Sequence, residues 1–148
     1  MTYDWEKDFK YGVDAEIAFA KIYKQKTGRE LIHINEKNKP DFSFGDSFIE
    51  LKTERYTKNI FFEIKNNNDF KPTGPFKARE QNATFIVWHP KQKLNNLYVF
   101  ETDKLCDWLL AHDYPTIDVN NAHGYLVNKQ FAIYLTFCKI FTYNMEEV

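Results

Sequence analysis

The stretch of residues 40–52, which reads PDFSFGDSFIELK, constrains the fold of this chain more than any other. It contains two short runs that mix polar and apolar residues, separated by Gly45-Asp46. A glycine in a two-residue connection is typical of a tight β-hairpin, because glycine adopts the positive φ that such turns need. The turn at Gly45 and Asp46 fixes the predicted cross-strand pairs, which are Phe44 with Ser47, Phe42 with Ile49 and Asp41 with Glu50.

This register places two carboxylates directly opposite each other. Side chains alternate faces along a strand, so Asp41, Glu50 and Lys52 share one face, whereas Phe42, Ile49 and Leu51 share the other. Opposed side chains lie ~5 Å apart, where two like charges repel. A hard cation between the two carboxylates replaces their repulsion with attraction to the cation. Mg²⁺ prefers a few carboxylate oxygens together with water and phosphate. The pattern therefore indicates phosphodiester cleavage.

The same residues resemble the PD-(D/E)xK nuclease superfamily, whose signature here is Pro40-Asp41 followed by Glu50-Leu51-Lys52. The resemblance implies an α/β fold with a restriction-endonuclease-like core, in which a mixed central β-sheet is flanked by α-helices. It also implies DNA as the partner and Mg²⁺ (or Mn²⁺) as the cofactor. The tripeptide is weak evidence alone, since acid-x-Lys recurs at residues 8–10, 63–65 and 69–71, but only the copy at Glu50 has an acid predicted in register with it. The alternative interpretation is a surface hairpin with a solvated charge cluster.

A finer likeness links residues 11–90 to small phage and bacterial endonucleases of the Holliday-junction-resolvase type. It is carried by residues 52–55, 59–63 and 71–74. It implies structure-specific cleavage of branched DNA by a homodimer, and it makes a phage gene one source of the chain. Two alternatives stay open. One is a restriction-type endonuclease that reads a duplex sequence, and the other is a non-catalytic module that binds nucleic acid or protein on the same fold.

The resemblance assigns roles to individual residues. Asp41 and Glu50 bind the metal together with the backbone carbonyl of Leu51, and Lys52 orients or deprotonates the attacking water or stabilises charge on the phosphorus. Glu16 interrupts an apolar stripe on a predicted helix at residues 11–25, where a carboxylate needs a partner or a metal. The resemblance implies that Glu16 is the third acid, since junction-resolving members of the superfamily often carry a glutamate on this helix. The alternative for Glu16 is a solvated position at the edge of that stripe.

Phosphate contacts are expected from a loop and a short helix that follow the hairpin. A net charge of −1 means that a nuclease of this composition must concentrate its cations on one face. Such contacts give affinity but little sequence information. The candidates are Arg55, Lys58, Thr73, Lys77 and Arg79.

Periodicity predicts the remaining elements. A helix ends at Gly28, and His33 lies in an apolar run that favours a core or half-buried position over a role as a general base. Residues 60–65 are predicted to continue the sheet, with Glu63 either an accessory acid or a partner of Lys52 or Lys65. The other predictions are strands at 31–34, 84–88, 97–100 and 124–127, a helix at 76–82, a helix at 102–111 capped by Thr102, and a helix at 129–143 capped by Asn128, where strand alternation fits as well.

Length and composition set outer limits. The 148 residues, with 43% hydrophobic content, fit a single domain that spans residues 1–148. Residues 1–6 lack a hydrophobic signal sequence, and no apolar run approaches the length that spans a membrane. Cys106 and Cys138 lie too far apart for zinc-ligand spacing. We therefore expect a cytoplasmic protein with reduced thiols and no membrane partner. An apolar surface in residues 129–143 is the predicted dimer interface.

Overall fold

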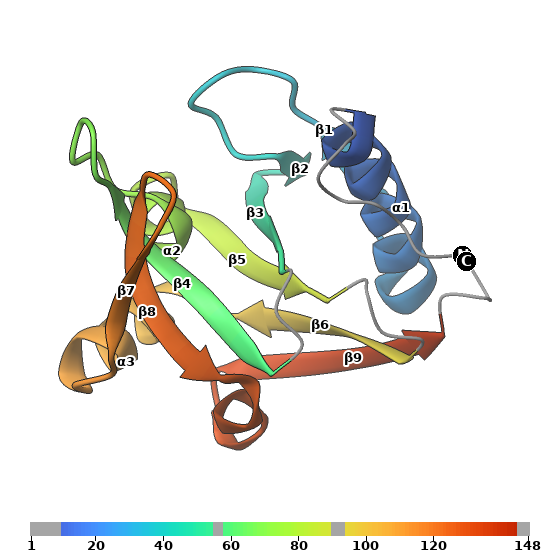
Figure 1. Ribbon diagram of the computed structural model, residues 1–148. Coiled ribbons are helices and arrows are strands. Elements are labelled where there is room, and N and C mark those ends of the chain that lie inside the picture. The colour runs from blue at the N-terminus through green and yellow to red at the C-terminus, as the bar shows by residue number, and fades with distance from the viewer. Residues whose placement is uncertain (1–9, 55–57, 90–93, 145–148) are drawn as a thin grey trace.

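The computed structural model describes residues 10–54, 58–89 and 94–144, which form a mixed α/β fold (Figure 1). The described helices are α1 (Lys10–Thr27), α2 (Gly74–Glu80), α3 (Thr102–Ala111) and a short 3₁₀ helix, η1 (Lys129–Tyr134). The central mixed sheet has the order β1-β2-β3-β5-β6-β9, and a smaller antiparallel sheet has the order β4-β8-β7. The strands are β1 (Ile32–His33), β2 (Phe42–Phe44), β3 (Ser47–Thr53), β4 (Asn59–Asn66), β5 (Ala83–Trp88), β6 (Leu94–Phe100), β7 (Thr116–Val119), β8 (Ala122–Asn128) and β9 (Cys138–Asn144).

Both faces of the central sheet are covered. Helix α1 packs on one face, while α2, α3 and the smaller sheet lie toward the other (Figure 1). Strand β5 serves both cores because its side chains alternate, so that Phe85 and Val87 join the α2/α3 side and Ile86 and Trp88 join the α1 side. The predicted central strand, buried on both faces, is therefore confirmed.

The hairpin forms in the predicted register. Strands β2 and β3 pair antiparallel, with Phe42 opposite Ile49 and Phe44 opposite Ser47. Gly45 has a φ of 57°, which is the left-handed conformation that the turn requires. Strand β3 then pairs in parallel with β5, which places Glu50 beside Phe85 in the interior of the sheet.

Several element predictions are wrong. Strand β4 does not continue the central sheet but pairs with β8 in the smaller one. Residues 129–143 form η1 and then β9, which pairs with β6, so the long helix predicted there is absent. Thr102 does not cap α3 with its side chain; its hydroxyl donates to the Ala83 carbonyl and accepts from the Phe85 amide, which fastens α3 to β5.

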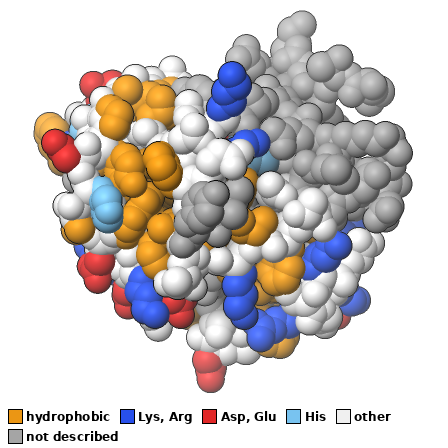
Figure 2. All heavy atoms as spheres, turned by 90° about the horizontal axis from the view of Figure 1, so that it is seen from below, with side chains coloured by type: hydrophobic (Ala, Val, Ile, Leu, Met, Phe, Trp, Pro, Cys, Tyr) orange, Lys and Arg blue, Asp and Glu red, His pale blue; other side chains and the backbone are white. Residues whose placement is uncertain are grey.

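A hydrophobic surface lies on the side of the molecule where α3 and η1 are found. Figure 2 shows hydrophobic side chains gathered on this face. Leu110 on α3 and Phe131 on η1 are both exposed, and the centre of the Phe131 ring lies 6.0 Å from that of Tyr114. The homodimer predicted from sequence stays a prediction, and this is the surface we expect it to use. Among the described residues no helix is long and apolar enough to cross a membrane.

We expect Gly124→Ala to destabilise the smaller sheet strongly. A Cβ at this position of β8 meets the Phe62 carbonyl oxygen of β4 at 2.3 Å and the Glu63 Cα at 2.8 Å, and backbone atoms cannot move aside cheaply. The expected loss in the free energy of unfolding is about 3 kcal/mol. Chemical denaturation of the variant measures it, with Gly28→Ala as a comparison, because no atom lies within 4 Å of a Cβ there although φ is positive. Equal stability of Gly124→Ala and the parent would show that β4 and β8 do not pair this closely.

Candidate active site

Asp41 and Glu50 come together at the open end of the hairpin that β2 and β3 form. The Leu51 amide donates to Asp41 Oδ2 at 2.8 Å, which fixes the Asp41 carboxylate over β3. Glu50 points toward α2, where Lys77 Nζ lies 3.7 Å from Glu50 Oε2. Glu50 Oε2 is buried and accepts no hydrogen bond from any residue that the structure describes. The hairpin thus delivers two neighbouring carboxylates, one of them with an unused oxygen.

The pKa of the Glu50 carboxyl is raised to about 8. Burial is the largest cause, and the hydrogen bonding and negative charge of Asp41 raise it further, whereas Lys77 lowers it. Two carboxylates held together in a poorly solvated place titrate as a coupled pair, because the second negative charge is costly. A divalent cation would remove this cost.

This raised pKa predicts a pH-dependent stability. The folded state holds the Glu50 proton up to about pH 8, whereas the unfolded chain loses it near the ordinary value of 4.5. The folded state binds more protons in this interval, so the free energy of unfolding should fall as pH rises from about 5 to about 8 and level off above. Denaturant titrations in a chelator measure the slope. Glu50→Gln should remove most of it, and an unchanged slope in that variant would contradict the assignment.

Glu16 is held by a histidine that the sequence did not assign to the site. The Glu16 Oε2 atom contacts His33 Nε2, and the His33 ring packs 5.4 Å from that of Phe42. Burial and the charge of Asp41 raise the pKa of Glu16, while His33 opposes this rise. Glu16 is therefore close enough to Asp41 for their charges to interact, and it is half-buried rather than solvated at the edge of the helix. Its role as the third acid stays a prediction. His33 is exposed and not a core residue, because β1 is the edge strand of the sheet.

Lys52 lies on the same face as Glu50 but contacts a different acid. Its Nζ atom is 3.6 Å from Glu63 Oε1 and 5.2 Å from the centre of the Phe61 ring. Of the two roles considered for Glu63, the structure shows the one in which it pairs with Lys52. The lysine is only 20% exposed, so β4 holds it against the hairpin. Sequence could not show this contact, because it depends on how the smaller sheet packs against the central one.

The residues predicted to contact phosphate do not form one cluster in the part of the chain that the structure describes. Arg55 lies outside the described residues. Lys58 is exposed just before β4, where its carbonyl accepts from the Lys129 amide, and Lys77 is the cation nearest to Glu50. Thr73 precedes α2, and its Oγ1 is buried without a hydrogen-bond partner among the residues described.

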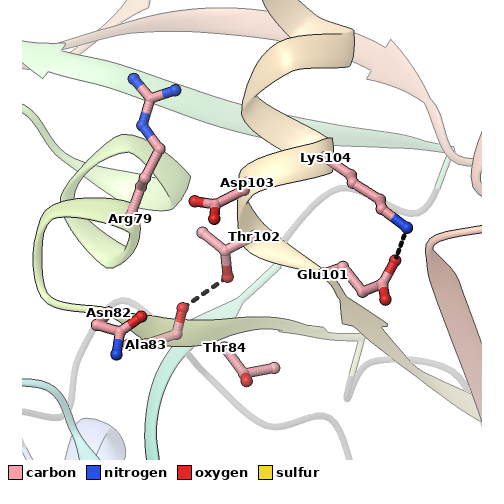
Figure 3. Close-up of a pocket in the computed structure, with 8 residues that line it drawn as sticks. All are labelled: Arg79, Asn82, Ala83, Thr84, Glu101, Thr102, Asp103 and Lys104. Atoms are coloured by element: carbon pink, nitrogen blue, oxygen red, sulfur yellow. Dashed lines mark hydrogen bonds and ion pairs between the residues drawn. The ribbon is translucent and has the colours of Figure 1, made fainter.

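Arg79 faces away from the acids. It follows Lys77 by two helical positions, which turns it to the opposite side of α2. There it lies 3.9 Å from Asp107 and lines a pocket of about 310 Å³ between α2 and the start of α3 (Figure 3). Lys104 lines the same pocket together with Glu101 and Asp103, so two cations and two anions balance its charge.

The residues at the hairpin fit a magnesium ion with few protein ligands. Within the described parts of the chain, no group of three or more His, Cys, Asp and Glu side chains converges as a ready metal site. Glu16 in particular is engaged by His33. Mg²⁺, however, commonly takes only one or two carboxylates and fills its remaining positions with water and phosphate. Asp41 and Glu50 meet that requirement, and the unpartnered Glu50 oxygen is the feature that a cation would satisfy. A Leu51 carbonyl ligand stays a prediction.

Comparison of the chain with protein-family models, with curated proteins and with solved structures gave no match. The function of the protein is therefore inferred from the site itself.

Proposed function

We propose that this protein is a metal-dependent endonuclease with a restriction-endonuclease-like core that hydrolyses phosphodiester bonds in DNA, with branched DNA such as a Holliday junction as its substrate. The observation that carries the proposal is the interacting pair Asp41 and Glu50. The Glu50 Oε2 atom is buried, accepts no hydrogen bond from the residues described, and lies 3.7 Å from Lys77 Nζ. A pair of like charges in this environment is costly for a fold to keep without a cation. A cation that displaces the Glu50 proton would make the pair dianionic, and such a site flanked by lysines is suited to a cation bound together with a phosphate.

The roles of the side chains follow from their positions. Asp41 and Glu50 would hold Mg²⁺, and Glu16 would contribute through water. The ion supplies charge neutralisation at the phosphate and makes water more acidic. Lys77 approaches from α2 and Lys52 from β3. Their ammonium groups stabilise the negative charge that develops on the phosphoryl oxygens in the transition state. When substrate binds, Lys52 leaves Glu63 and contacts the substrate. Glu63 is thus the ion-pair partner of Lys52 in the substrate-free protein.

Cleavage of labelled DNA tests the proposal. Purified protein is incubated with four-way junction, flap, duplex and single-stranded DNA, in Mg²⁺, Mn²⁺ or chelator. We expect metal-dependent cuts in the junction, with little cutting of duplex. Sequence-dependent cuts in plain duplex would support the restriction-type alternative. No cleavage of any substrate in either metal would rule out the nuclease.

A non-catalytic binding module is the second candidate, and the contact between Lys52 and Glu63 favours it. A lysine that is already neutralised and 20% exposed is less available for catalysis than the sequence motif implies. The two candidates differ in their metal response. A nuclease site should gain thermal stability from Mg²⁺, since the ion binds only the folded state, whereas a module without a metal site should not.

The junction activity also implies a dimer. Two symmetric cuts require two sites related by a two-fold axis. Light scattering at assay concentration measures the mass. A monomer that cuts would favour a nicking enzyme over a resolvase.

A further inference from the structure

A groove of about 460 Å³ opens next to the pair formed by Asp41 and Glu50. It lies between the loop before β2 and the loop that joins β4 to α2, two segments that Figure 1 places near α2. The residues that matter for its chemistry are Asn38, Asn66, Lys71, Thr73, Lys77 and Gln81. Lys77 belongs to both the groove and the acidic pair, because it also lies 3.7 Å from Glu50. The groove is therefore continuous with the proposed cleavage site.

The lining of the groove is rich in amides and carries no net charge. Lys71 and Lys77 are balanced by Asp69 and Glu80. Gln81 crosses the groove, since its Nε2 donates to the Asn38 carbonyl at 2.9 Å, and its Oε1 is buried without a partner in the described part of the chain. Amide side chains match the mixed donors and acceptors of a nucleobase edge, whereas a neutral lining suits a bare phosphate poorly. The volume is in the range of ~300–1,000 Å³ typical of small-ligand sites.

An exposed aromatic residue stands in the chain between two residues that line this groove. Phe70 lies between the lining residues Asp69 and Lys71 and is 67% exposed. Its φ is 59°, a conformation that bulky residues rarely adopt and that proteins keep mainly at functional positions. Lys65 Nζ lies 5.2 Å from the centre of the ring. An exposed aromatic ring beside a cation is the combination on which proteins stack the bases of single-stranded nucleic acids.

We propose that the groove and Phe70 bind an unpaired nucleobase of the substrate strand, in the nucleotide next to the phosphate that is cut. The base stacks on Phe70 and presents its edge to the amide side chains, while Lys77 contacts the backbone phosphate between groove and acids. A base inside a duplex cannot enter, because its faces are stacked and its edge is paired. This inference rests on the proposed function and deepens it. The bases of a four-way junction are paired, but the branch interrupts the helical stack, so a base beside it unpairs at lower cost than a base inside a duplex, and the enzyme selects branched DNA by taking up that base.

Binding without cleavage tests the groove separately from the nuclease. The probe is a DNA duplex with one unpaired 2-aminopurine, compared with the fully paired duplex, in Ca²⁺ as a non-cleaving substitute for Mg²⁺. We expect the parent protein to bind the unpaired probe roughly 10-fold more tightly, with a change in 2-aminopurine fluorescence on stacking. Phe70→Ala and Gln81→Ala should each remove most of this preference while affinity for the paired duplex stays the same.

Phe44→Ala is the matched control, because it removes another exposed phenyl ring, 41% exposed and on the face of β2 opposite to that of Asp41. It should keep the preference. Equal affinity of the parent for both probes, or an undiminished preference in both groove variants, would overturn the proposal. If the protein shows the groove-dependent preference but never cuts DNA in Mg²⁺, base binding in the groove is supported and the nuclease function is ruled out. If it cuts junctions without the preference, the nuclease function is supported and base binding in the groove is ruled out.

Discussion

Asp41→Asn and Glu50→Gln should each lower the rate of DNA cleavage by ~10²-fold or more while the fold is kept, a loss that corresponds to about 2.7 kcal/mol of transition-state stabilisation. Both substitutions keep the shape of the side chain and remove its charge. The side-chain amide oxygen that Asp41→Asn introduces can still accept from the Leu51 amide, which donates to Asp41 at 2.8 Å in the parent. Glu50→Gln removes a buried carboxyl whose pKa is raised to about 8, so it should leave stability equal or higher at neutral pH.

Single-turnover cleavage of a junction in Mg²⁺ measures the effect, with circular dichroism to show that each variant is folded. Glu30→Gln is the matched control, because the Glu30 side chain is 80% exposed and contacts only Lys24 among the ion pairs described. It should cut like the parent. The double variant should be no slower than the slower single one, since both acids act on one ion. Normal cleavage by both single variants would remove these two residues from the mechanism.

Phe19→Ala should cost about 3–5 kcal/mol in the free energy of unfolding. Phe19 is fully buried on α1, and its ring lies 5.4 Å from that of Phe42 and 6.5 Å from that of Trp88. It is the side chain that joins α1 to both the hairpin and the central strand. Its loss leaves a cavity between them and loosens the helix that carries Glu16, so cleavage should fall as well.

Urea denaturation measures this loss. Leu110→Ala serves as the control, since Leu110 is 59% exposed on α3 and its truncation should change stability by less than about 0.5 kcal/mol. A loss below about 1 kcal/mol for Phe19→Ala, well short of the range for a buried phenyl ring, would show that α1 is not packed on the sheet as the structure has it.

The hairpin was predictable because its signals are local. Gly45 supplies the turn, and alternation then fixes which side chains share a face, so the pairing of Phe42 with Ile49 followed from the sequence. Phe48 breaks the polar face of the hairpin, and the structure gives the reason: that face is covered, and Phe48 packs into the core beneath α2 and the smaller sheet.

Long-range partners were not predictable. Strand β4 alternates like a sheet member, but nothing in residues 59–66 indicates that its partner is β8, which comes much later in the chain. Apolar residues at every second position in 131–137 fit a strand and a helix equally, but neither forms over that whole stretch. Residues 129–134 form η1, and β9 begins only at Cys138, where pairing with β6 places Phe141 opposite Leu97. The contacts of Lys52 with Glu63 and of Glu16 with His33 are of the same kind, since each joins elements whose packing no local pattern specifies.

Calorimetric titration with Mg²⁺ at about pH 8, comparing the parent with Asp41→Asn, tests most directly whether the hairpin carries a cation site. The parent should bind Mg²⁺ with protons released from the acidic pair, and Asp41→Asn should show no binding at the same concentrations. Absence of binding in the parent, or the same binding in both proteins, would contradict the account.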